Sequence, residues 1–205
     1  MFISDAHRDV LAEVVNIGVG QAAGSLNSIL DTHVDLSVPD LKILEKGQLS
    51  EELNILGGRS VASVVLRFEG TVPGQAALIF PPESAVNLVN LLMSQESMAD
   101  YMDLDAMRRE ALTEIGNIVL NAVMGHFANF LRLNLDYSIP DFMMKSDINS
   151  IFHLDKTDEE FVIILAKTHF VMSEHSIGGD ILLFFGIDSL KSLIQVVEAV
   201  INGET

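Results

Sequence analysis

The sequence contains no cysteine and no tryptophan, and only two tyrosines and five prolines occur among its 205 residues. Without cysteine the chain can form no disulfide and no zinc–thiolate site, and it has no thiolate nucleophile. The lack of cysteine also suits a reducing cytoplasm. Disulfide-stabilised and thiol-dependent classes of protein are therefore excluded.

Basic residues and long apolar stretches are scarce as well. Twelve Lys and Arg stand against 29 Asp and Glu, which gives a net charge of −17. Sequence-independent binding of nucleic acid needs a basic face, so nucleic acid is not expected as a partner. Although 49% of the residues are hydrophobic, no uninterrupted apolar stretch approaches the roughly 18 residues of a membrane-spanning helix. The sequence thus predicts a folded cytoplasmic protein with no signal peptide and no membrane insertion.

What the sequence does contain is one short signature that occurs twice, Glu-x-x-Asn followed by 22 residues and a proline. The first copy is formed by Glu13, Asn16 and Pro39, and the second, 101 positions later, by Glu114, Asn117 and Pro140. A duplicated fold need not preserve exposed polar side chains. Their preservation therefore indicates a duplicated site rather than ordinary surface residues.

The surrounding sequence repeats in the same order, as a helix, strands and a second helix. The first half is predicted to form a helix from Ser4 or Asp5, strands over 34–38, 60–68 and 75–80, and a helix over 83–93. The second half is predicted to form a helix over 105–131, strands over 135–139, 160–172 and 181–185, and a helix over 188–201. The strand after each motif helix is expected to end at the motif proline, with 41–44 as an alternative extension of the first after a kink.

These patterns predict an α+β fold with a largely antiparallel sheet and helices packed on it. The fold is internally duplicated, and a pseudo-twofold axis would bring the two motif helices side by side. Residues 1–205 would form a single domain made of two halves, 1–98 and 104–205, joined by the loop 94–103. Small residues after Asn16, including Gly18, Gly20 and Gly24, indicate the close approach of another backbone.

A Glu and an Asn three positions apart project from the same side of a helix. The carboxylate can pair with a basic group of a partner, and the carboxamide offers both a donor and an acceptor. Such an amide can hold a water facing an electrophile, although it cannot act as a base or nucleophile at neutral pH. The motif therefore suits positioning a water at a phosphoryl group that another molecule carries. Both prolines are interpreted as structural.

The repeated residues resemble the consensus of the CheC/CheX/FliY family of chemotaxis phosphatases, (Asp or Ser)-x-x-x-Glu-x-x-Asn-x22-Pro. Asp9 fills the first position of the first copy, whereas Glu110 departs from Asp or Ser in the second. The resemblance extends over the whole chain, and two copies in one short chain are most similar to the CheC type.

The resemblance implies hydrolysis of the aspartyl-phosphate of a CheY-type response regulator in chemotaxis. By the same resemblance, Glu13 and Glu114 would dock a regulator lysine, and Asn16 and Asn117 would direct the attacking water. The chain would bind no cofactor or metal, because the Mg²⁺ would belong to the regulator. CheD is a further partner that the resemblance implies, and the internal symmetry makes a monomer the expected state.

An alternative from another functional class stays open, namely a non-catalytic adaptor or flagellar-switch-like module that only docks CheD or CheY. Two other patterns in the sequence do not indicate a function. The glycines from Gly18 to Gly24 lie inside a predicted helix, whereas a dinucleotide-binding loop must follow a strand. The six histidines are scattered without carboxylates at matching spacing, so no metal site is predicted.

Overall fold

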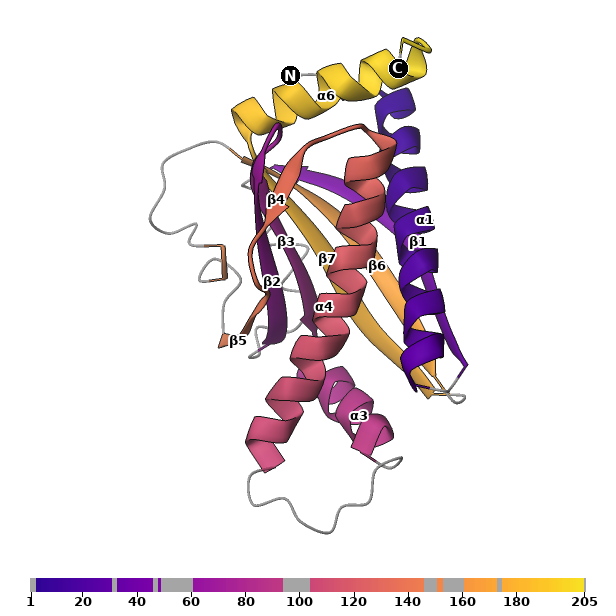
Figure 1. Ribbon diagram of the computed structural model, residues 1–205, viewed down its shortest axis with the longest axis vertical. Coiled ribbons are helices and arrows are strands. Elements are labelled where there is room, and N and C mark those ends of the chain that lie inside the picture. Colours follow the sequence, from indigo (N-terminus) through magenta and orange to yellow (C-terminus); the bar gives the residue numbers. More distant parts are fainter. Residues whose placement is uncertain are drawn as a thin grey trace.

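The computed structural model describes residues 3–30, 33–45, 48, 61–93, 104–145, 151–152, 161–172 and 175–204. Within them a twisted sheet is covered on one face by two long helices, while shorter helices lie at its two ends (Figure 1). This arrangement confirms the predicted α+β class. The predicted loop 94–103 lies outside the described residues.

The elements follow the predicted order in both halves. The first half contributes α1 (Asp5–Leu30), β1 (Val34–Glu45), β2 (Val61–Gly70), β3 (Gly74–Phe80) and α3 (Pro82–Met93). The second half contributes α4 (Leu104–Phe130), β4 (Leu135–Tyr137), β5 (Asp141–Lys145), β6 (Phe161–Met172), β7 (His175–Gly186) and α6 (Ile187–Ile201). β7 is longer than the predicted strand over 181–185, because the residues from His175 onward, including Gly178 and Gly179, already pair with β6.

The sheet has the order β1-β6-β7-β3-β2-β4, with β5 also paired to β2, and every pairing among the described residues is antiparallel. The pseudo-twofold axis passes between β7 and β3, the equivalent strands of the two halves. Each half gives a strand to the other: β1 pairs with β6 of the second half, while β4 and β5 pair with β2 of the first.

The two strands that follow the motif helices differ at the prolines. β1 continues through Pro39, which confirms the alternative extension over 41–44, and its register with β6 shifts between Ser37 and Asp40. In the second half β4 ends at Tyr137, two residues short of the predicted end at 139, and a separate strand, β5, pairs with β2 from Asp141 onward. Here Tyr137 faces Phe68 and Asp141 faces Val65, which leaves one extra residue on the second-half side. A proline lacks the N–H that a regular ladder needs, and a bulge accommodates it within the strand.

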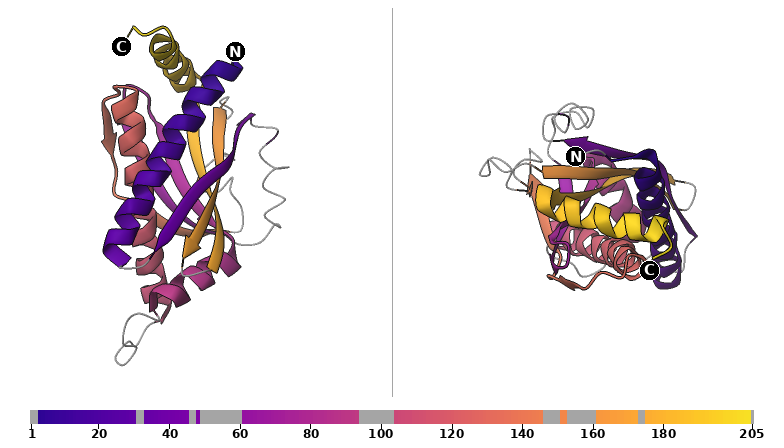
Figure 2. Two further views of the ribbon diagram at one scale, coloured as in Figure 1. Left: turned by 90° about the vertical axis from the view of Figure 1, so that its right-hand side faces the viewer. Right: turned by 90° about the horizontal axis from the view of Figure 1, so that it is seen from above.

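The two motif helices lie on the same face of the sheet and cross each other (Figures 1 and 2). At the crossing a Cβ added to Gly18 would lie 2.8 Å from the Cα of Val123, which confirms the predicted close approach at this glycine. Gly20 and Gly24 face open space, so the prediction of close approach is wrong for them. In α4 a Cβ on Gly116 would lie 2.5 Å from the side chain of Val64, so α4 packs directly on β2.

Buried side chains from α1, α4 and the facing strand residues form one large core cluster. A smaller cluster lies on the other face of the sheet, where Ile151 and Phe152 pack on it. Buried and exposed side chains alternate only weakly along β2 and β3, because both faces of these central strands are buried.

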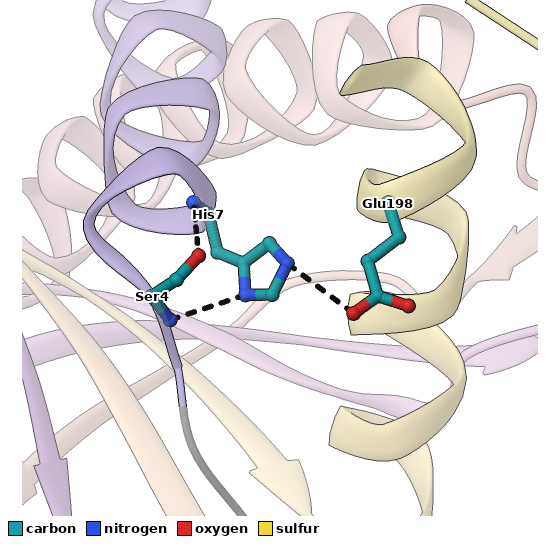
Figure 3. Close-up of polar contacts among 3 residues, drawn as sticks. All are labelled: Ser4, His7 and Glu198. Carbon is teal, nitrogen blue, oxygen red and sulfur yellow. Dashed lines mark hydrogen bonds and ion pairs between the residues drawn. The ribbon is translucent and has the colours of Figure 1, made fainter. Parts of the chain in front are cut away.

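The start of α1 is linked to α6 through the buried ring of His7 (Figure 3). The Ser4 hydroxyl accepts from the His7 N–H at 3.3 Å, and the Ser4 N–H donates to His7 Nδ1 at 3.2 Å. This reciprocal pair resembles a capping box and places the N-cap at Ser4. The other ring nitrogen, Nε2, faces Glu198 Oε1 of α6 at 3.6 Å.

Candidate active site

The first motif lies on the solvent-facing side of α1. Its core side is fully buried through Leu11, Val14 and Val15, and these residues hold the helix on the sheet. Glu13 and Asn16 lie on the opposite side of the helix, and both are exposed. Asp9, one turn before Glu13, is exposed on the same stripe.

The second motif is presented by α4 in a similar way. Glu110 and Glu114 are exposed, and Asn117 is partly exposed. The neighbouring Ile115 and Gly116 are buried against the sheet, so the helix cannot rotate without losing this packing. All four Glu and Asn side chains of the two motifs are therefore accessible to a partner molecule.

The segment that carries the second motif proline, from β4 to β5, contacts α4. The Tyr137 hydroxyl donates to the Met124 carbonyl at 3.1 Å, and the Arg109 guanidinium lies 6.0 Å from the centre of the Phe142 ring. Partial burial of the Tyr137 phenol raises its pKa above the ordinary value of 10.0. These two contacts fix both ends of the strand segment relative to the helix.

Pro140 lies between the residues that make these two contacts, in the segment between β4 and β5. Its neighbour Ile139 has a side chain that is 90% exposed. The second motif proline thus belongs to a segment whose flanking residues contact α4.

The two motif copies lie close to the crossing of α1 and α4. Asn16 is two residues from Gly18, and Asn117 is six residues from Val123, so each is within about two helical turns of the contact. The Gln21 amide donates to His126 Nδ1 at 3.2 Å and joins the two helices next to this contact. The copies are therefore carried by one rigid helix pair rather than by separate bodies.

The two copies differ in one contact that sequence reasoning missed. Asn121 Nδ2 donates to Asn117 Oδ1 at 2.5 Å, from one turn further along α4. The signal that could have revealed it is the i,i+4 spacing, which places two amides on one face of a helix. In the first copy the equivalent position is Gly20, which has no side chain to offer.

Within the described ranges no three His, Asp or Glu side chains are grouped so that they could hold a metal ion. The same part of the chain contains no helix long and apolar enough to cross a membrane. The two motif copies therefore present four carboxylates and two carboxamides on the helix surfaces, which suits contact with another macromolecule.

Comparison with known proteins agrees with this geometry. The model of the CheC-like family matches residues 7–43, which span the first motif from before Asp9 to beyond Pro39. The CheY-P phosphatase CheC of Bacillus subtilis is 33% identical over 143 residues, or 68% of this chain and 66% of that protein. The chain belongs to the CheC-like family.

Solved structures of proteins with several different names share the fold. FliY of Thermotoga maritima superposes with a TM-score of 0.67 at 18% identity, covering 97% of this chain and 98% of that one. The FliM middle domain of H. pylori gives a TM-score of 0.63 at 14% identity, covering 95% and 99%. At these identities the likeness concerns the fold alone, so the CheC-like fold is shared by proteins of different names.

Proposed function

We propose that this chain hydrolyses the aspartyl-phosphate of a CheY-type response regulator in chemotaxis signalling. The observation that carries the proposal is the exposure of both Glu/Asn pairs, on two crossing helices, in a chain of the CheC-like family. It is supported by the B. subtilis relative, which is named a CheY-P phosphatase. The regulator and its acyl phosphate are the substrate, and the chain acts as a protein phosphatase of the cytoplasm.

In this proposal the carboxylates dock and the carboxamides catalyse. Glu13 or Glu114 pairs with a lysine of the regulator, and this ion pair sets the helix against the regulator's active site. The side-chain oxygen of Asn16 or Asn117 then accepts a hydrogen bond from one water. This bond orients the water so that a lone pair of the water oxygen faces phosphorus. Asp9 and Glu110 shape the same face, and the segments that carry Pro39 and Pro140 follow the two motif helices.

The reaction needs no covalent participation of this chain. The water oxygen bonds to phosphorus while the bond from phosphorus to the aspartyl oxygen breaks. The aspartate leaves as a carboxylate, and the proton of the water passes to the released phosphate. The Mg²⁺ that neutralises the phosphoryl oxygens belongs to the regulator, and the chain itself holds no cofactor or metal.

The experiment that tests the proposal follows the loss of phosphate from a purified, phosphorylated CheY-type regulator with Mg²⁺ present. Catalytic amounts of this chain should accelerate the loss above the spontaneous rate, with several turnovers per molecule of chain. A spontaneous rate that is unchanged at every concentration of the chain would contradict the proposal.

The fold also occurs in FliM middle domains, and this favours a second candidate function, a docking module without catalysis. Such a module would bind CheY or CheD through the same exposed glutamates. It predicts binding of the phosphorylated regulator without any change in the rate of phosphate loss, so the same time course separates the two functions. In either case a monomer suffices, because the internal symmetry already supplies two motif helices.

A further inference from the structure

The amide of Asn117 is held by a neighbour, whereas the amide of Asn16 is not. Asn121 Nδ2 donates to Asn117 Oδ1 at 2.5 Å, and Asn117 is partly buried. The Asn16 side chain is exposed and makes no hydrogen bond with the described residues. Gly20 stands at the position that corresponds to Asn121, so α1 offers Asn16 no amide one turn away.

We propose that Asn121 is a positioning residue of the second site, and that its absence from the first makes the two sites unequal in turnover. This inference rests on the proposed function, since it concerns how the amide meets the attacking water. A carboxamide oxygen has two lone pairs. Asn121 occupies one of them and leaves the other for the water.

The bond acts on catalysis by fixing the orientation of the Asn117 amide. An unheld carboxamide rotates about its last bond and presents oxygen or nitrogen to the partner in turn. Asn16 must give up this freedom whenever it orients a water, whereas Asn117 is already ordered. Ordering a single side chain in advance changes a rate by about threefold to tenfold. We expect the increase in kcat rather than a decrease in KM, because docking through Glu114 does not involve Asn121.

The direction of the Asn121–Asn117 hydrogen bond leads to a more specific prediction. Asn121 donates and Asn117 accepts. An aspartate at 121 is nearly isosteric with asparagine but can only accept while it is ionised. It would turn the Asn117 amide over, so that nitrogen replaces oxygen at the place where the water binds.

Gly20 provides the reciprocal experiment. A Cβ added to Gly20 meets no atom within 4 Å, and the position is exposed, so a larger residue can be introduced there. Gly20→Asn therefore places an amide one turn after Asn16 and reproduces the arrangement of the second site. Gly20→Ala is the matched control, because it makes the same change of backbone freedom but supplies no amide.

The test measures kcat and KM for a phosphorylated CheY-type regulator in chains that keep one site. With Asn16→Ala in place, Asn121→Ala should lower kcat about threefold to tenfold and leave KM unchanged. Asn121→Asp should lower kcat at least as far. With Asn117→Ala in place, Gly20→Asn should raise kcat by a similar factor, and Gly20→Ala should leave it unchanged.

A kcat that is unaffected by Asn121→Ala, or a loss that falls on KM, overturns the inference. Full activity of Asn121→Asp overturns it as well, since it contradicts the direction of the bond. A second readout needs no activity: the side-chain amide of Asn117 should show higher NMR order than that of Asn16, and Asn121→Ala should abolish the difference. If the unaltered chain has no phosphatase activity, the proposed function fails. Equal order in both amides of an active chain defeats the inference alone.

Discussion

At the scale of single residues, two glycines in α1 have opposite surroundings although they are only two positions apart. A Cβ on Gly18 would lie 2.8 Å from the Cα of Val123, whereas a Cβ on Gly20 would meet nothing within 4 Å. Backbone atoms of α4 cannot move aside as a flexible side chain can. Gly18 is thus required by the helix crossing that carries both motifs, and Gly20 is not.

We predict that Gly18→Ala destabilises the protein and Gly20→Ala stabilises it. Alanine improves helix formation by about 0.5–1 kcal/mol over glycine at either position. At Gly18 the clash with α4 outweighs this gain, because the two helices must separate to admit a methyl group. Thermal unfolding of the two variants checks the prediction, and equal shifts of Tm would contradict it.

The placement of the motif residues could be predicted because their spacing relative to the apolar residues can be read from the sequence. The repeated Glu and Asn could be placed on the exposed side of a helix from the apolar residues around them. Asn121 was missed, since nothing repeats at that position: its counterpart is Gly20. A contact present in one copy alone leaves no trace in a search for shared residues.

At the scale of elements, both motif helices and the order of the strands could be predicted from periodicity. The predicted helix over 105–131 differs from α4 by one residue at each end, and the predicted strand over 75–80 differs from β3 by one. Apolar residues at helical spacing in α4, and the apolar run of β3 between a glycine and a proline, explain this agreement.

The strand boundaries at the prolines could not be predicted so well. A proline in a sequence indicates a missing backbone N–H. It does not indicate whether the pairing with a neighbouring strand can continue without that hydrogen bond. In this fold a register shift at Pro39 and one extra residue before Asp141 absorb the interruption. The pairing therefore continues past both prolines, which keeps each strand beside its motif helix.

At the scale of the whole molecule, the two halves are interlocked rather than adjacent. β1 of the first half pairs with β6 over ten residue pairs, and β4 and β5 of the second half pair with β2. Sequence alone could not show this exchange, because the repeat is compatible with strands that pair within their own half. The strand that follows α1 thus pairs with the second half, and the strands that follow α4 pair with the first half.

We predict that cutting the chain between the halves leaves them associated. A protease site introduced within 94–103 would allow cleavage of the folded protein at a defined place. The two fragments should co-elute in gel filtration and keep the circular dichroism of the intact chain, since the exchanged strands hold them together. Fragments that elute apart while each keeps its native spectrum would contradict the strand exchange.

The central claim is that two carboxamides on crossing helices each direct a water at the acyl phosphate of another protein. The most direct test is the single-turnover rate of phosphate loss from a phosphorylated CheY-type regulator saturated with the Asn16→Ala/Asn117→Ala chain. Binding, measured in parallel, should persist through Glu13 and Glu114. We predict that the regulator in this complex loses phosphate at its spontaneous rate. A double variant that still accelerates the loss would contradict the claim.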